Sequence, residues 1–265
     1  MSEKIDALTA AALGALQGLT EFLPVSSSGH VAIGAHYFDI GGSPLALVVL
    51  LHLGTLLATV IFLREDIWSL LVEARATLRD PRRLTATPEG RTLVGIMIAT
   101  VITAFLGLAL GNAAVTFSHD LRLVGAGFLV SAACLLASGV ARARDTEVSW
   151  LQAIAVGIAH GVAVLPGISR SGATIATAMI LGIEGNAAFR FSFLISLPAI
   201  VGAAAYEAGG AEGLGSLGLS AWVGGMTALV TGYLALVILR HIVLVGRMWT
   251  FAIYLIPLGL FLVTR

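Results

Sequence analysis

Six long apolar segments dominate the chain, and each has the length of a membrane-spanning helix. Such a helix needs about 20 mostly apolar residues. The six segments lie at residues 44–63, 92–110, 122–141, 187–206, 220–239 and 248–263. This pattern predicts an all-α polytopic membrane protein with six transmembrane helices.

Two further apolar regions, residues 5–38 and 150–183, are interrupted in the middle by Pro, Gly and Ser. Each arm of these regions is too short to span a bilayer, so we expect two re-entrant helical hairpins. Irregular backbone at membrane depth is tolerated only where it is buried in protein or lines a wet cavity. Each break is therefore predicted to lie at a cavity.

The two breaks resemble each other in sequence. When the second break is laid over the first without a gap, their small residues coincide: Gly18 with Gly161, Ser26 with Ser169, Ser28 with Ser171, and Gly29 with Gly172. The prolines miss by one position. Each break precedes three spans, and because three is odd the second half must be inverted. We expect two inverted-topology repeats, residues 1–141 and 142–265, within one membrane domain, as in many transporters.

Basic residues are concentrated on one side of the predicted spans. Eleven of the 15 Lys and Arg residues lie in the polar stretch 64–91, in the segment 142–149, and at Arg190, Arg240 and Arg247. Because Lys and Arg are enriched in cytoplasmic loops, we assign this side to the cytoplasm. Hairpin 5–38 is then expected to enter from outside and hairpin 150–183 from the cytoplasm.

Composition supports the same class of protein. Charged residues make up 11% of the chain, whereas soluble domains carry roughly 25%. The net charge of zero indicates no nucleic-acid partner, and the single cysteine, Cys134, excludes an intramolecular disulfide. The N-terminal segment is a poor signal peptide because Glu21 follows its apolar part, so we expect it to be retained.

Glu21 lies within the first broken region, where an ionised side chain is costly and indicates a functional site. Gln17 precedes it by four residues and shares its helix face. The alternative is that Glu21 reaches an interface near the mouth of the hairpin.

Arg170 lies in the second break, within the motif SRSG, and needs an anionic partner at membrane depth. Its planar fork suits phosphate, and backbone N–H groups and hydroxyls of SRSG and SSSGH can converge on the same anion. Two alternatives stay open. Glu21 can be the partner in a structural ion pair, and the small residues can serve helix capping and packing.

His30 directly follows the first serine motif and can exchange a proton near neutral pH. A serine close to an acid and a histidine is a candidate nucleophile. We expect His52 and His160 to be polar helix contacts rather than catalysts. Together the two breaks suit phosphoryl transfer, in which positioning and charge stabilisation dominate, on a lipid that carries phosphate.

At these residues the chain resembles the bacitracin-resistance family of undecaprenyl-diphosphatases. The matching motifs are LQGLTEFLPVSSSGH, LPGISRSGAT, LLHLGTLLAT and FSFLISLPA, and the resemblance covers essentially the whole chain. It implies a multi-pass bacterial plasma-membrane hydrolase whose active site faces outside. The reaction converts a polyprenyl diphosphate to the monophosphate carrier of cell-wall glycan synthesis.

The resemblance also assigns roles by position. Glu21 is the motif acid, Ser27 the favoured nucleophile, His30 the motif histidine and Arg170 the phosphate-binding arginine, with attack by water as the alternative to Ser27. Substrate binding is expected to involve Gln17, Ser26, Ser28, Gly29, Ser169, Ser171, Gly172 and Thr174.

A divalent cation, Mg²⁺ or Ca²⁺, is implied by the same resemblance, with Glu21 as its ligand. Gln17 stands where many members have glutamate, so the ion would depend more on the substrate's phosphates. The expected partners are the lipid diphosphate and the bilayer, and a homodimer is one open arrangement. The rival function is a polyprenyl-phosphate transporter, which the inverted repeat favours; a membrane scaffold would leave Glu21 and Arg170 unexplained.

Overall fold

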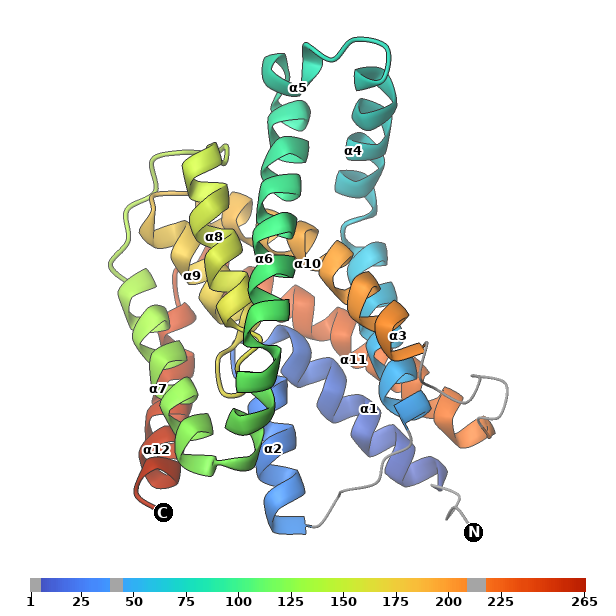
Figure 1. Ribbon diagram of the computed structural model, residues 1–265, viewed down its shortest axis with the longest axis vertical. Coiled ribbons are helices and arrows are strands. Elements are labelled where there is room, and N and C mark those ends of the chain that lie inside the picture. Colours follow the sequence, from blue (N-terminus) through green and yellow to red (C-terminus); the bar gives the residue numbers. More distant parts are fainter. Residues whose placement is uncertain (1–5, 39–44, 209–217) are drawn as a thin grey trace.

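The computed structural model describes residues 6–38, 45–208 and 218–265 (Figure 1). In these ranges the chain forms helices and no β-strand, which confirms the all-α class. The α-helices are α1 Ala7–Phe22, α2 Ser27–Phe38, α3 Leu45–Phe62, α4 Arg64–Thr77, α5 Arg83–Ala86, α6 Pro88–His119, α7 Leu121–Ser138, α8 Trp150–Val162, α9 Arg170–Ile180, α10 Gly185–Ala208, α11 Leu219–Leu244 and α12 Ala252–Val263. A short 3-10 helix, η2 Met248–Phe251, leads into α12.

The apolar helices confirm a multi-pass membrane protein. Within the described ranges, α6, α7, α10 and α11 are each long and apolar enough to cross a membrane. α3 passes this test only together with α4, and the two helices are bent by 77°. η2 and α12 form a shorter apolar helix over Met248–Val263. The straight span predicted at 44–63 is thus one arm of a bent pair.

The polar stretch 64–91 folds into α4 and α5 rather than into an irregular loop. Glu73 on α4 joins this helix to the residues that follow it: its carboxylate accepts hydrogen bonds from Arg83 Nε (3.1 Å), Arg83 Nη2 (2.6 Å) and Thr87 Oγ1 (2.6 Å). Thr87 also caps α6 by accepting from the Gly90 N–H. These contacts tie α4 to the start of α6, and the Arg83 bonds hold the pKa of Glu73 below its usual value.

The two broken regions form hairpins that meet in the middle of the molecule. In Figure 1, α1 rises from the end where the C-terminus lies, and α2 returns toward that end. α8 descends from the opposite end, near α4 and α5, and α9 turns back toward it. Pro24 and Pro166 lie in the two breaks, where a proline cannot continue a helix. The hairpins therefore enter from opposite ends, while the inverted repeat itself stays a prediction.

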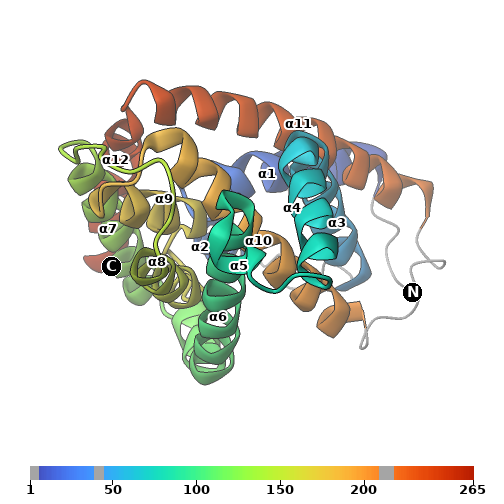
Figure 2. The ribbon, with the colours of Figure 1, turned by 90° about the horizontal axis from the view of Figure 1, so that it is seen from above.

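The first helix of each hairpin packs against a long helix of the other half of the chain. α1 packs along α11, and α8 packs along α6 (Figure 2). Both contacts use glycines: a Cβ on Gly18 would lie 2.7 Å from the Ala228 carbonyl oxygen, and one on Gly157 would lie 2.8 Å from the Ala99 Cα. α3 also contacts α10, and α7 contacts α12. A twofold relation between the halves would produce this pattern, while the division at residue 141 stays a prediction.

The largest buried side chains surround the meeting point of the hairpins. Phe22 at the end of α1 packs edge-on against Phe193 of α10, with ring centroids 5.7 Å apart, and Phe193 packs against Phe189. Phe128 of α7 is fully buried on the other side. This apolar core fixes the ends of α1 and α9, from which the polar side chains of the breaks project.

Candidate active site

A cavity of about 290 Å³ lies where the two breaks meet. The first break and α3 contribute Thr20, Glu21, Ser26, Ser27, Ser28 and His52 to its lining. The second break, α6 and α10 contribute Thr103, Gly107, His160, Gly161, Ala163, Val164, Ile168, Ser169, Arg170, Ala199 and Ile200. The predicted cavity therefore exists, and both halves of the chain build it.

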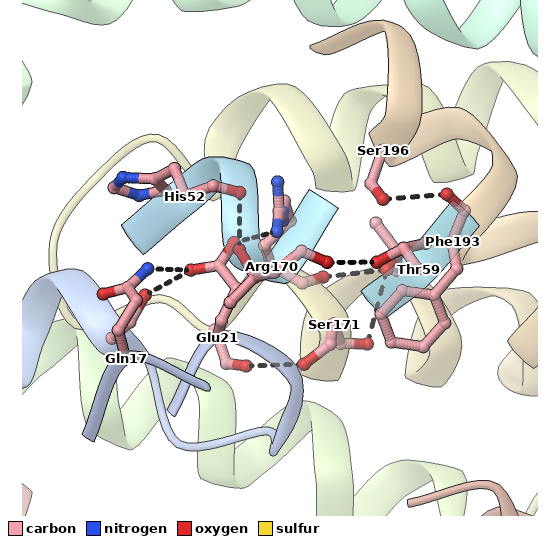
Figure 3. A network of polar contacts seen from close by, with 12 residues as sticks. Gln17, Glu21, His52, Thr59, Arg170, Ser171, Phe193 and Ser196 are labelled. Carbon is pink, nitrogen blue, oxygen red and sulfur yellow. Dashed lines mark hydrogen bonds and ion pairs between the residues drawn. The ribbon is translucent and has the colours of Figure 1, made fainter. Parts of the chain in front are cut away.

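Glu21 is the centre of the polar network in this cavity (Figure 3). It lies in the last turn of α1 and is buried. One carboxylate oxygen accepts hydrogen bonds from Gln17 Nε2 and from Ser27 Oγ, both at 3.1 Å. The other oxygen forms an ion pair with Arg170. Among the described residues that line the cavity, Glu21 is the only carboxylate.

The first serine motif forms a tight turn at the start of α2. Ser26 adopts φ of 66°, a left-handed conformation that is uncommon for a residue with a side chain. Its hydroxyl accepts from the Gly29 N–H at 3.3 Å and lies 3.3 Å from Ser28 Oγ. This turn points Ser27, the next residue, at Glu21.

The second serine motif, at the start of α9, repeats the hydrogen-bond pattern of the first but not its backbone conformation, because Ser169 is extended with φ of −75°. Ser169 Oγ accepts from the Gly172 N–H at 3.1 Å and lies 3.3 Å from Ser171 Oγ. The Ser169 N–H in turn donates to Ser131 Oγ at 2.8 Å. Arg170 takes the position in this turn that Ser27 takes in the first.

The two turns also contact each other reciprocally. A Cβ built on Gly29 would lie 3.0 Å from the Gly167 Cα, and one on Gly172 would lie 3.1 Å from the Pro24 Cβ. The two contacts are equivalent in the alignment that pairs Gly29 with Gly172. Bulkier side chains at either glycine would separate the turns and with them Ser27 and Arg170.

Arg170 crosses from the second break to the acid of the first. Its guanidinium pairs with Glu21, and its side chain remains 25% exposed while that of Glu21 is 7% exposed. Behind it, Thr174 Oγ1 donates to the Arg170 carbonyl at 2.8 Å and forms a hydrogen bond with Ser192. The pairing with Glu21, which the sequence left open as an alternative, is present, and Arg170 lines the cavity.

Several predicted binding residues support the site from behind. Gln17, Gly29, Ser171, Gly172 and Thr174 are absent from the described lining of the cavity. Gln17 orients Glu21, whereas the other four hold the turns and the start of α9. Ser26, Ser27, Ser28 and Ser169 line the cavity directly.

His30 does not join these side chains. Its Nδ1 lies 2.8 Å from the Ser26 carbonyl oxygen, and its Nε2 lies 2.7 Å from the Tyr254 hydroxyl on α12. The ring stacks on Tyr254 and meets Phe128 edge-on. Because α2 directs the ring toward α7 and α12, the structure does not place His30 with Ser27 and Glu21.

Two other histidines line the cavity instead. His52 Nδ1 lies 2.9 Å from the Val48 carbonyl oxygen, and His160 Nδ1 lies 2.9 Å from Thr103 Oγ1. Within the described chain, His160 Nε2 is buried without a hydrogen-bond partner. Sequence reasoning treated both as ordinary helix contacts. The one signal in the sequence was that His160 pairs with Gln17 when the two breaks are aligned.

Glu21, the expected ligand of a divalent cation, has no second acidic side chain beside it in the described lining of the cavity. The described residues contain no group of three His, Cys, Asp or Glu side chains that could hold a metal ion. The Glu21 carboxylate is already engaged by Gln17, Ser27 and Arg170. A Mg²⁺ or Ca²⁺ ion prefers several oxygen ligands, and a single shared carboxylate supplies too few of them.

Comparison with known proteins gives a consistent result. The family described as "Bacitracin resistance protein BacA" matches residues 10–261. A protein of Desulfosudis oleivorans named "Undecaprenyl-diphosphatase" is 42% identical over 260 residues, covering 93% of this chain and 94% of the relative. Relatives of the same name from Treponema denticola (37% identical; 94% and 93% covered) and Korarchaeum cryptofilum (35%; 94% and 95%) match over similar lengths.

Proposed function

Because the chain belongs to the bacitracin resistance protein BacA family, we propose that it hydrolyses undecaprenyl diphosphate to the monophosphate and inorganic phosphate. The names of its relatives favour this hydrolase activity over the rival polyprenyl-phosphate transporter. One observation in the structure carries the proposal: Glu21, Ser27 and Arg170 line one cavity although they come from opposite halves of the chain.

Arg170 is proposed to bind the diphosphate. The guanidinium is the one partly exposed cation beside Glu21 in the described cavity. A phosphate can replace Glu21 as its partner and bind both arms of the guanidinium. Transfer of Arg170 from Glu21 to the substrate leaves the carboxylate with the hydrogen bonds from Gln17 and Ser27. Binding of the anion thereby draws the positive charge of Arg170 away from Glu21, the group that must accept a proton.

Ser27 is the proposed nucleophile and Glu21 its base. The Ser27 hydroxyl already donates to Glu21 Oε2 at 3.1 Å, within reach for proton transfer. The Ser27 oxygen attacks the terminal phosphorus, the bond to the bridging oxygen breaks, and the lipid monophosphate leaves. Water then attacks the phosphoserine, the bond between the Ser27 oxygen and phosphorus breaks, inorganic phosphate leaves, and Glu21 returns the proton that it accepted to the Ser27 oxygen.

The size of the cavity suits the head group alone. Small-molecule sites usually measure roughly 300–1,000 Å³, and this cavity, at about 290 Å³, lies at the lower end. The polyprenyl chain therefore stays in the bilayer, and the diphosphate enters a site at membrane depth. We propose that the site opens to the outer face of a bacterial plasma membrane, since hairpin α1–α2 starts from the end opposite α4 and α5 (Figure 1).

A divalent cation is proposed to arrive with the substrate rather than to reside in the protein. The diphosphate oxygens would supply most of its ligands, and Glu21 is the one lining carboxylate in the described chain. Binding of Mn²⁺, followed by electron paramagnetic resonance with and without a non-hydrolysable diphosphate lipid, tests this proposal. Equal Mn²⁺ binding in the absence of the lipid contradicts it.

Phosphate release is the direct test of the proposed function. The purified protein in detergent should release inorganic phosphate from undecaprenyl diphosphate and leave the monophosphate. A transporter would instead move the lipid between leaflets of a vesicle without releasing phosphate.

A homodimer is also proposed. Light scattering measures the mass of the same preparation and tests this proposal.

A further inference from the structure

His30 has both ring nitrogens engaged, and its partners fix its tautomer. The Ser26 carbonyl oxygen can only accept, so the Nδ1 at 2.8 Å carries a proton and donates. In the neutral ring Nε2 is then the acceptor, and the Tyr254 hydroxyl at 2.7 Å donates to it. Neither nitrogen is left to exchange a proton with Ser27.

The carbonyl that His30 holds belongs to the most constrained residue of the site. Ser26 is the one residue other than glycine with positive φ in the described chain. Such strained conformations persist only where the surroundings over-determine them, and they cluster at functional sites. The Ser26 carbonyl accepts from both the His30 ring and the His30 backbone N–H, while the Ser26 hydroxyl accepts from Gly29.

We propose that Tyr254 and His30 form a positioning pair for the nucleophile. The Tyr254 hydroxyl holds the His30 ring, the ring holds the Ser26 carbonyl, and the turn so fixed aims Ser27 at Glu21. This inference rests on the proposed function, in which Ser27 attacks the phosphorus. It makes His30 a positioning residue rather than a base, and it adds Tyr254 on α12 to the residues that the reaction needs.

The packing around His30 supports a fixed ring. Tyr254 stacks on it at 5.8 Å between centroids with an interplanar angle of 13°, and Phe128 closes the edge at 5.4 Å. A base must reach its substrate, and this ring is held between Tyr254 of α12 and Phe128 of α7 rather than beside Ser27. The Tyr254 side chain is 49% exposed, so removal of its hydroxyl leaves no buried polar group behind.

Replacement of Tyr254 by Phe tests the outer member of the pair. Tyr254→Phe should lower kcat about three- to tenfold, the loss expected for one hydrogen bond, while KM changes less than twofold. The matched control is Tyr233→Phe on α11, whose ring packs against Phe62, and it should leave both constants unchanged. Equal constants for Tyr254→Phe and the wild-type protein would overturn the proposal.

Replacement of His30 tests whether the residue transfers a proton. Asn can place an N–H donor where Nδ1 lies but cannot act as a base. His30→Asn should therefore retain at least a tenth of the wild-type kcat, whereas His30→Ala should fall at least tenfold below His30→Asn. If His30→Asn is as inactive as His30→Ala while both proteins remain folded, His30 is a catalytic base and the positioning role is wrong.

A spectroscopic measurement separates this inference from the proposed function. In protein labelled with ¹⁵N-histidine, the His30 signals, assigned through His30→Asn, should show a protonated Nδ1 and an acceptor Nε2. Tyr254→Phe should shift the Nε2 signal of His30, whereas the control Tyr233→Phe should leave the His30 signals unchanged. A protonated Nε2 with a bare Nδ1 would overturn the pair. Failure of the wild-type protein to release phosphate would reject the enzyme assignment, and the spectra would still decide the pair.

Discussion

Three consecutive serines in the first break have three different environments. Ser26 is buried and caps α2 through its hydroxyl. Ser27 donates to Glu21, and Ser28 is exposed in the cavity lining. Only the middle residue combines access to the cavity with a proton acceptor, and this is the physical reason for assigning attack to Ser27.

Ser27→Ala should abolish turnover and leave substrate binding nearly intact, because binding rests on Arg170 and the loop N–H groups. A hydroxyl that only binds phosphate is worth roughly 1–3 kcal/mol, or about ten- to a hundredfold in rate, and loss of a nucleophile costs far more. Phosphate release and binding of a non-hydrolysable diphosphate lipid should be measured side by side. Ser28→Ala should be compared in the same assays, because it removes a cavity hydroxyl that does not donate to Glu21, and a merely tenfold loss in Ser27→Ala would point to attack by water.

Arg170→Lys should lose most activity although the protein still folds. Lysine keeps the charge that pairs with Glu21 but cannot offer a planar fork to phosphate. Arg190→Lys serves as the control, because Arg190 forms an ion pair with Asp66 away from the cavity. Near-normal turnover in Arg170→Lys, measured as phosphate release, would show that Arg170 is only the counter-ion of Glu21.

At the scale of the element, close helix contacts place the breaks. α1 approaches α11 at Gly14, where a Cβ would overlap the Gly224 carbonyl. Gly111 on α6 has nothing within 4 Å of its Cβ position. Replacement of each glycine by alanine therefore separates the cost of disturbing the α1–α11 contact from the gain in helix propensity.

Gly14→Ala should lower the apparent Tm of the protein in detergent, because α1 must move away from α11 and carries Glu21 with it. Gly111→Ala should leave the Tm unchanged or raise it, since alanine favours a helix by up to about 1 kcal/mol over glycine. Thermal unfolding followed by circular dichroism distinguishes the two. Equal shifts in both variants would mean that the α1–α11 contact is not tight.

The hairpin of α4 and α5 should lose stability in acid. Hydrogen bonds from Arg83, and then from Thr87, hold the pKa of Glu73 below its usual value of 4.5. A depressed folded-state pKa stabilises the fold at pH above 4.5, and this contribution is lost as the pH falls through the lower folded value. The protection factors for hydrogen exchange across residues 73–87, which correct for the slower intrinsic exchange in acid, should therefore fall as the pH drops below 4.5 and through the lower folded value.

Glu73→Gln should produce the same loosening at neutral pH, seen as faster tryptic cleavage at the arginines of residues 75–83. Glu65→Gln is the matched control on the same helix, because the Glu65 side chain is 89% exposed and its ion pair with Arg64 is long, at 3.5 Å. Cleavage at equal rates in the two variants would contradict a structural role for the Glu73 network.

At the scale of the whole molecule, the two ends differ in charge. α4, α5 and the segment between α7 and α8 lie at one end, whereas the turn between α6 and α7 lies with the C-terminus at the other (Figure 1). The arginine-rich end is expected in the cytoplasm. The opening of the site to the outside depends on this orientation.

Cysteine labelling in a Cys134→Ala background tests the orientation. Thr85→Cys, in α5, should resist an impermeant reagent added to intact cells and react after lysis. His119→Cys, at the opposite end, should react in intact cells. Both positions are exposed, so access to the reagent differs only by side. Labelling of Thr85→Cys from outside would reverse the topology and the outward-facing site.

The residues of the chain predicted the membrane class, the two breaks, and Glu21 and Arg170 as site residues, whereas Ser27 was assigned through the family resemblance. They did so because apolar length, chain-breaking residues and buried charge are local properties, each readable without knowledge of neighbours. The alignment of the two breaks likewise predicted that they are related, and the hydrogen bonds of Ser26 and Ser169 repeat each other.

Only the tertiary structure decided which side chains share the cavity. The direction of a side chain depends on the neighbours of its helix, so His30 turns to Tyr254, 224 residues away, and His160 turns to Thr103 instead of solvent. The attachment of α4 to the start of α6 also depends on side-chain contacts, namely the bonds that join Glu73 to Arg83 and Thr87. Such contacts join residues whose separation along the chain leaves no periodic signal.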